Sequence, residues 1–378
     1  MDKCIVEILS LIKNISGYKN LVHKVRFFMK KNFKLIVLML LGIIISPSIV
    51  SAKCNNEFEY FITPKSEEWK KYSAYELQDK LNIPKENVDK LNTKDLLDLV
   101  LDYPFIGDVY AFNTVEDGIN EIRKRFNPLD VLLNREDIAK VLYNRYINLE
   151  NPVISKNIKC EESDDCLKIN FIEFLLEKNE VFIKLNEEQI REISKKAVKM
   201  SLESEVESEF EKKDSVFSEC YTDELKKSSS GVYTPRGTYV EAFILGEQLS
   251  QSKKNEINSY FDKTYPNAKR LRGATTNYNC HSYAWYSTSA NNRYWINDTS
   301  PYKNDGSYTN VGFLPKHSGQ ILYYPVEGGH SAIVNRTSSN IWGVNMTSKW
   351  GRAGLYNHNY GNDPYASGAL NISNWRKN

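Results

Sequence analysis

The spacing of hydrophobic residues changes along the chain and divides it into two halves. From Ser66 to about Asp214, apolar residues recur at helical spacing in a background rich in Leu, Lys, Glu and Asp. Leu96, Leu97, Val100 and Leu101 mark one apolar face of a helix that is capped by Thr93 and stopped at Pro104. Further helices are predicted over residues 115–126, 135–149 and 187–210. The first half is therefore predicted to be mostly α-helical.

Beyond Ser228–Gly231 the sequence is rich in aromatic residues, Gly, Asn and Ser, and its apolar runs become short and strand-like. Strands are predicted over residues 238–245, 320–324, 330–334 and 341–347, and helices over residues 256–265 and 280–286. The last three strands are expected to form an antiparallel sheet behind the helix at 280–286. The expected fold class is α+β, with a helical N-terminal domain over residues 53–228 and a second domain over residues 229–378.

The N-terminal end carries the pattern of an export signal. Residues 29–34 are basic, residues 35–45 form an apolar run of 11 residues, and Val50-Ser51-Ala52 suits cleavage, so residues 29–52 are predicted to be a signal peptide. A membrane-spanning helix needs about 20 apolar residues. Residues 1–28 precede a complete signal and are interpreted as an extension of the gene model. The protein is expected to be secreted or associated with the cell envelope. If the signal is not cleaved, residues 35–52 would be its membrane anchor.

Composition and charge limit the possible partners. The chain has 378 residues, 41% of them hydrophobic, which is enough for at least two cores. A formal net charge of +2 and the lack of a basic repeat or RNA-binding motif give no reason to expect nucleic acid. No Cys or His pair has metal-ligand spacing, so neither a metal nor a cofactor is expected. The mature chain would contain five cysteines, in which Cys160 and Cys166 either pair or stay reduced and Cys280 is the odd thiol.

Cys280 and His330 stand in two short motifs that suit nucleophilic catalysis. Cys280 begins the predicted helix at 280–286, where the free N–H groups and the helix dipole favour a thiolate. His330 follows two glycines and is the first residue of a predicted strand. A nucleophilic cysteine followed by a histidine base is the arrangement of an acyl-transfer site. His281 would point about 100° away along the helix and is not expected to be the base.

A third residue would hold the tautomer of His330. With a hairpin turn near Ser338, the partner of His330 lies around residues 345–347, and Asn345 is the first choice because its amide oxygen can accept the imidazole N–H. Thr347 and Ser348 are alternatives. Oxyanion-hole donors are expected from the backbone N–H of Cys280 and from Asn277 or Asn279, although both asparagines also suit a turn before a helix.

Aromatic side chains and the remaining histidines have more than one interpretation. The candidates for the walls of a substrate cleft are Trp285, Tyr286, Trp342 and Trp350. Their alternative role is in the core of the domain. His317 and His358 lie in Gly- and Asn-rich stretches, where surface positions are expected.

The motifs around Cys280 and His330 resemble two groups of bacterial proteins. Asn279-Cys280 with its aromatic-rich helix, followed by Gly329-His330-Ser331-Ala332-Ile333-Val334, resembles the core of cell-wall cysteine peptidases and amidases of the NlpC/P60 and CHAP type. This resemblance covers about the last 110 residues and implies a papain-like domain with an antiparallel sheet packed on the catalytic helix. The blocks at residues 278–285, 348–351 and 354–356 also resemble a group of uncharacterised secreted proteins of Gram-positive bacteria.

The expected function is that of a secreted cysteine hydrolase that cleaves an amide bond. The resemblance implies that peptidoglycan or a cell-surface peptide is the substrate. Two alternatives stay open. One is a catalytically inactive envelope-binding or adhesion module that keeps the fold, and the other is a secreted deamidase or transferase that uses the same thiol.

Overall fold

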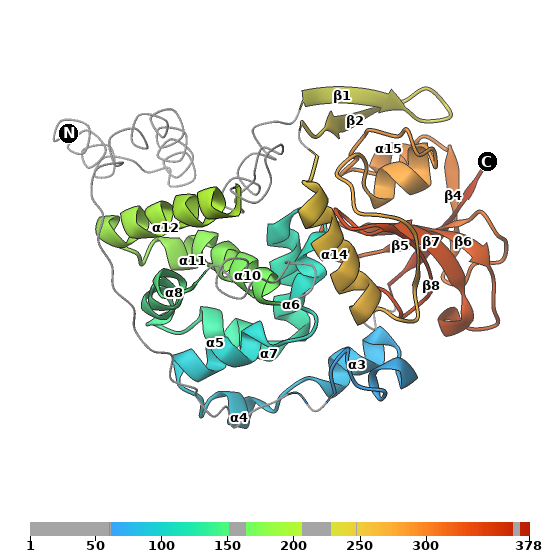
Figure 1. The fold of residues 1–378 in the computed structure, drawn as a ribbon. Helices are drawn as coiled ribbons and strands as arrows, with labels where there is room; N and C mark the ends of the chain where they lie inside the picture. The colour runs from blue at the N-terminus through green and yellow to red at the C-terminus, as the bar shows by residue number, and fades with distance from the viewer. Residues whose placement is uncertain (1–59, 61, 151–163, 206–227, 247, 366–370) are drawn as a thin grey trace. The chain divides into compact units, whose positions relative to one another are not determined.

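The computed structural model describes residues 60, 62–150, 164–205, 228–246, 248–365 and 371–378 (Figure 1). All of these residues belong to one compact unit. The predicted signal peptide and residues 1–28 lie outside the described residues. Within the described ranges, no helix is long and apolar enough to cross a membrane.

Helices make up the first half of this unit. Between Trp69 and Glu205 the named elements are η1 (Trp69–Lys71), α3 (Ala74–Lys80), α4 (Lys85–Val88), α5 (Thr93–Leu101), η2 (Ile106–Ala111), α6 (Val115–Arg125), α7 (Asn127–Leu133), α8 (Ile138–Ile147), α10 (Asp165–Glu177), α11 (Asn179–Phe182) and α12 (Glu187–Glu205). The predicted helix at 115–126 is confirmed as α6. The prediction that Thr93 caps α5 is wrong by one residue. The side chain of Asn92 is the cap, because it accepts the hydrogen bond from the Asp95 N–H.

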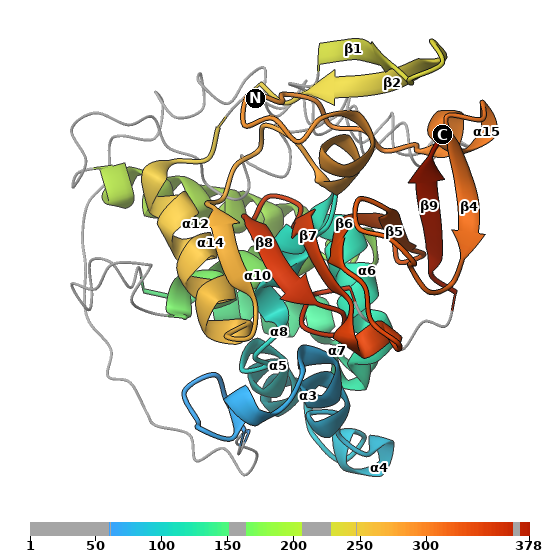
Figure 2. The same ribbon diagram turned by 90° about the vertical axis from the view of Figure 1, so that its right-hand side faces the viewer.

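The second half contains two antiparallel sheets. β1 (Ser228–Tyr233) and β2 (Tyr239–Ile244) form a hairpin. The larger sheet contains β3 (Lys269–Arg272), β4 (Tyr308–Gly312), β5 (Ile321–Tyr324), β6 (His330–Arg336), β7 (Asn345–Lys349), β8 (Leu355–Asn359) and β9 (Ser373–Lys377). Its strands follow the order β3-β8-β7-β6-β5-β9-β4, and Figure 2 shows β8, β7, β6 and β5 side by side. Helices together with antiparallel sheets confirm the α+β class.

The two faces of the larger sheet are covered by different parts of the chain. Side chains alternate between the faces of a strand. On the inner face, Leu322, Ala332 and Met346 share a core with the helices of the first half and with α14 (Gln251–Thr264). On the outer face, Ile333 and Leu355 pack with Tyr278 and Tyr283 beside η4 (Ser282–Tyr286). The remaining short helices are α15 (Ser300–Asn304) and η5 (Ile341–Gly343).

One hydrophobic core joins the two predicted domains. It contains Leu97 and Ile122 from the first half and Val334 and Trp350 from the second. The Trp69 indole N–H also donates to the carbonyl of Thr264 at 2.8 Å, across the predicted boundary. The segments 53–228 and 229–378 therefore pack together within the same compact unit as far as they are described.

Candidate active site

Cys280 is the first residue of the helix on the outer face. Helical structure runs over residues 280–286, as predicted. Asn279 caps this helix, because its Oδ1 accepts the N–H of Ser282 at 3.0 Å. Trp285 fixes the helix against β6 by donating its indole N–H to Ser331 Oγ at 2.8 Å. The Asn279 cap and the Trp285 indole thus position Cys280 beside the beginning of β6.

The Cys280 thiol is free and buried, with a relative exposure of 3%. Burial raises its pKa to about 11 and outweighs the hydrogen bonds from the backbone N–H groups of Ser331 and His281 and the charge of Lys349. The prediction that this position gives a low thiol pKa is therefore wrong for the structure as it stands. Desolvation of the sulfur is the larger effect, and the thiol is neutral at neutral pH.

His330 is the first residue of β6, as predicted, and is fully buried at 0% exposure. Its ring stacks on Tyr365 with 3.4 Å between the ring centroids and meets the edge of Tyr324 at 5.3 Å. Neither ring nitrogen has a hydrogen-bond partner among the described residues. Burial, followed by the nearby His358 and His281, holds the pKa of His330 well below its usual value. The imidazole is therefore neutral, with its acceptor nitrogen unused.

Cys280 and His330 both lie at the beginning of β6. The thiol accepts the N–H of Ser331, the residue after His330, whereas the His330 ring lies with Tyr324 on the inner face. No hydrogen bond joins the two side chains. Tyr365 connects them, because it stacks on His330 and lies close enough to Cys280 for a charge on the sulfur to raise its pKa, after the larger effect of burial. Catalytic hydrogen bonds often shorten only when substrate binds.

Asn345 does not orient His330, so this prediction is wrong. The register pairs Asn345 with Arg336, at the far end of β6. Its amide donates to the side-chain oxygens of Asn357 at 3.1 Å and Asn359 at 3.0 Å. The alternatives do not reach the ring either: Thr347 pairs with Ile333 and accepts from Asn335, and Ser348 binds His358. The pairs Ile333–Thr347 and Val334–Met346 place the middle of the β6–β7 connection near residue 340 instead of Ser338, and η5 occupies residues 341–343, where the strand was predicted to begin. The position opposite His330 therefore lies further along the chain than predicted.

The two candidate oxyanion-hole asparagines have other partners. Asn277 accepts from the Gln248 side chain at 2.7 Å, in the turn before the helix. The Asn279 amide donates to the Ile296 carbonyl at 2.7 Å and to Asn113 Oδ1 at 3.0 Å. The backbone N–H of Cys280 points to its own sulfur. The Asn279 N–H that donates to Asn113 would become free to bind a ligand if Asn113 moved away.

The four candidate cleft aromatics separate into two groups. Trp285 and Trp350 are buried at 3% and 0% exposure and belong to the core, so the prediction that they line a cleft is wrong for them. Trp350 stacks on Tyr356 with 4.0 Å between the centroids. Tyr286 and Trp342 are exposed at 43% and 45% and stay available to a ligand.

Lys349 is a buried cation that sequence reasoning missed. Its ammonium group donates to the carbonyls of Thr275 at 3.0 Å, Gly351 at 2.5 Å and Ala353 at 2.6 Å. Burial lowers its pKa to about 7, and the nearby Cys280 opposes this shift. A positive charge at this position favours the thiolate form of Cys280. A single lysine in a predicted strand carries no signal of this role.

A second polar network lies beneath His330 on the inner face. His358 Nε2 lies 2.8 Å from Ser348 Oγ, and its Nδ1 lies 3.3 Å from Asp363 Oδ2. All three residues are buried, so the expected surface position of His358 is wrong. The Asn-rich stretch around it forms β8, whose alternation turns His358 inward. His317 is exposed, as expected.

His281, as expected, does not serve as a base for Cys280. Its Nδ1 lies 2.8 Å from Ser331 Oγ and its Nε2 lies 3.1 Å from the carbonyl of Gly328.

Cys166 is disulfide-bonded, and Cys160 lies outside the described residues.

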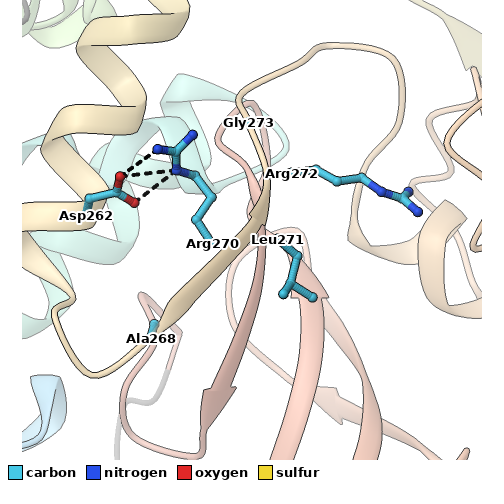
Figure 3. Close-up of a pocket in the computed structure, with 6 residues that line it drawn as sticks. All are labelled: Asp262, Ala268, Arg270, Leu271, Arg272 and Gly273. Carbon is cyan, nitrogen blue, oxygen red and sulfur yellow. Dashed lines mark hydrogen bonds and ion pairs between the residues drawn. The ribbon is translucent and has the colours of Figure 1, made fainter.

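A hollow of about 480 Å³ lies beside the edge strand β3 (Figure 3). It is lined by Asp262, Ala268, Arg270, Leu271, Arg272 and Gly273. Arg270 pairs with Asp262 at 2.7 Å, and Figure 3 shows Arg272 turned away from this pair. The hollow includes neither Cys280 nor His330. Among the residues that the structure describes, no group of three or more His, Cys, Asp or Glu could hold a metal ion.

Comparison with protein-family models, with curated proteins and with solved structures finds no match for this chain. A function has to be inferred from the geometry around Cys280.

Proposed function

We propose that the chain is a secreted cysteine hydrolase with a papain-like second domain, which cleaves an amide bond in peptidoglycan or a cell-surface peptide. The observation that carries the proposal is a free thiol in the first turn of a helix, which accepts the backbone N–H of Ser331, the residue after a histidine whose two ring nitrogens have no partner among the described residues. A buried polar group without a partner is uncommon and often has a catalytic role.

The residues divide the chemistry as follows. Cys280 attacks the carbonyl carbon of the amide, and His330 accepts the thiol proton and returns it to the leaving amine. Backbone N–H groups and the Lys349 charge stabilise negative charge that develops on sulfur and on the carbonyl oxygen. Stacking on Tyr365, rather than a hydrogen bond, orients the His330 ring. Secretion is part of the proposal and depends on the predicted signal peptide at residues 29–52.

Release of free amines from purified peptidoglycan tests the proposal. Cys280→Ser and His330→Ala should each lower the release rate at least ~100-fold, because a nucleophile or a general base contributes that much. His317→Ala is the matched control, since this histidine is exposed, and should keep the wild-type rate. Amine release that survives Cys280→Ser would refute the assignment.

A catalytically inactive envelope-binding module is the second candidate. It is favoured by the burial of Cys280 and by the missing hydrogen bond between Cys280 and His330. Cosedimentation with purified cell wall, without amine release by the wild type or by variants with an exposed thiol, would support the module.

A further inference from the structure

A short segment of the helical half contacts residues that flank Cys280 and His330 in the sequence or pack beside them. This covering segment consists of Tyr110, Ala111, Phe112 and Asn113, which follow and partly overlap η2. It belongs to the first half of the sequence but binds four separate places around Cys280 and His330 in the second half.

The backbone of the covering segment is bound in the way an extended peptide would be bound. The carbonyl of Tyr110 accepts the N–H of Arg352 at 2.7 Å, and the carbonyl of Ala111 accepts the Tyr365 hydroxyl. Phe112 has extended backbone angles, with φ −97° and ψ 168°. Gly351 permits this approach, because a Cβ there would stand 2.4 Å from the carbonyl carbon of Ala111 and 2.5 Å from the carbonyl oxygen of Phe112.

The side-chain carboxamide of Asn113 spans the two sequence motifs of the site. Its Oδ1 accepts from the amide of Asn279, the residue before Cys280, at 3.0 Å. Its Nδ2 donates to the carbonyl of Gly328, two residues before His330, at 3.1 Å. The Asn113 carboxamide is therefore held by one donor, from the motif that contains Cys280, and by one acceptor, from the motif that contains His330. These are the contacts that an amide group of a ligand would make.

Helix α6, which follows the covering segment, also holds the glycine turn before His330. The carboxylate of Glu121 accepts the N–H of Glu327 at 3.2 Å, and Lys124 forms an ion pair with Glu327. The covering segment and α6 thus bind both the turn and the helix that present the two catalytic candidates.

We propose that the covering segment occupies the substrate cleft of this protein, and that the ligand of the cleft is an extended peptide with a carboxamide in the place of Asn113. The proposal rests on the proposed function and names its substrate class. Arg352 N–H, Tyr365 OH, Asn279 Nδ2 and Gly328 O are the groups that would bind such a peptide. While the covering segment is in place, Cys280 is closed to substrate.

Displacement of the covering segment should also change the chemistry of the thiol. Burial is the largest cause of the high pKa of Cys280. Water that enters an open cleft would solvate the thiolate and lower this pKa, while Lys349 and the N–H groups keep their stabilising effect. The open form is therefore expected to be both more accessible and more reactive.

Alkylation of Cys280 by iodoacetamide at pH 8, followed by mass spectrometry of its peptide, tests the proposal in the full chain. Asn113→Ala removes both carboxamide contacts and should raise the alkylation rate at least tenfold over wild type. Asn120→Ala is the matched control, because Asn120 is also half-buried and lies on α6, where its side chain forms hydrogen bonds with Glu116 and Lys178. Its rate should stay within twofold of wild type.

Two further measurements keep the result interpretable. Tyr365→Phe keeps the ring stacked on His330 but removes the hydrogen bond to the Ala111 carbonyl, and should also accelerate alkylation of Cys280. It replaces Asn113→Ala as the test if that variant fails to fold. The peptide acetyl-Tyr-Ala-Phe-Asn-amide should slow alkylation of Asn113→Ala, whereas the same peptide with Leu in place of Asn should not. Unchanged alkylation in both folded variants, or equal effects of the two peptides, would overturn the proposal.

Alkylation requires access to the thiol and no catalysis, so the two proposals can fail separately. Suppose that the effect of Asn113→Ala persists in a His330→Ala background while no amine is released from peptidoglycan. The proposal that the covering segment occupies the cleft is then supported, and the hydrolase proposal is refuted. If wild-type Cys280 reacts as fast as a free thiol, the covering segment falls regardless of the activity.

Discussion

At the scale of the residue, His281 shows how a titratable group beside Cys280 is kept neutral. The Gly328 carbonyl can only accept a hydrogen bond, so His281 Nε2 carries the proton and Nδ1 accepts the hydroxyl proton of Ser331. The indole of Trp285 donates to the same hydroxyl oxygen. Burial lowers the pKa of His281 to about 4. The hydrogen bond from the Ser331 hydroxyl to Nδ1 therefore depends on the neutral ring.

Replacing His281 should reduce the acid sensitivity of the fold. Its unfolded pKa is about 6.5, above the folded value of about 4, so its contribution is complete above pH 6.5 and is lost as the pH falls toward 4. Between pH 7 and pH 5, the wild-type free energy of unfolding should fall by about 2 kcal/mol more than that of His281→Gln, as measured by urea denaturation. His317→Gln serves as the control. An identical pH dependence in wild type and His281→Gln would contradict the assignment.

At the scale of the element, one asparagine holds the helix that carries Cys280. Asn279 Oδ1 accepts the N–H groups of Ser282 and Ile296, and its amide donates to the Ile296 carbonyl. The helix end is buried, so these backbone groups have no access to water in place of the side chain. The short helix over residues 280–286 therefore depends on tertiary packing more than on its own length.

Asn279→Ala should destabilise the protein by about 2–3 kcal/mol, since it removes a cap and leaves buried backbone groups of Ile296 without partners. Urea denaturation measures the change. Asn92→Ala provides the comparison, because Asn92 caps the N-terminus of α5 in an exposed position and should cost about 1 kcal/mol. Equal losses in the two variants would show that the buried contacts of Asn279 are unimportant.

At the scale of the whole molecule, a buried carboxylate links elements from both halves of the sequence. Asp108 of η2 accepts a hydrogen bond from Arg125 of α6 at 2.8 Å. It also accepts from Tyr260, within α14, at 3.1 Å and from Tyr265, directly after α14, at 2.7 Å. Burial raises the pKa of Asp108 to about 6, although Arg125 and both tyrosines oppose this. The same network fixes η2, from which the covering segment emerges.

Asp108→Ala should cost about 3–5 kcal/mol, because it leaves the buried guanidinium of Arg125 without its charge partner. Far-UV dichroism, which reports the helices, and tryptophan fluorescence, which comes mostly from the second half of the sequence, should report the loss at the same urea concentration, as expected for one cooperative unit. Asp130→Ala breaks a half-exposed pair with Arg123 and should change stability by less than about 1 kcal/mol. Two separated transitions would contradict the shared core.

Features that depend on near neighbours could be predicted from the amino-acid sequence. Helical periodicity located α6, the turn residues before Cys280 located the helix at 280–286, and a glycine pair followed by an apolar run located the beginning of β6 at His330. Such signals repeat every two to four residues, so a local pattern is sufficient to read them. The prediction of helices followed by an antiparallel sheet was correct for the same reason.

The partners and the protonation states of the residues at the site could not be predicted in this way, because they depend on packing between distant segments. The longer connection between β6 and β7, which contains η5, places Asn345 away from His330, and β8 turns His358 inward although its surroundings resemble a loop. Asn113 meets Asn279 across 166 residues, and burial of the Cys280 thiol in the packed structure raises its pKa. Register, long-range hydrogen bonds and desolvation depend on how distant segments pack, and hydrophobic periodicity does not encode them.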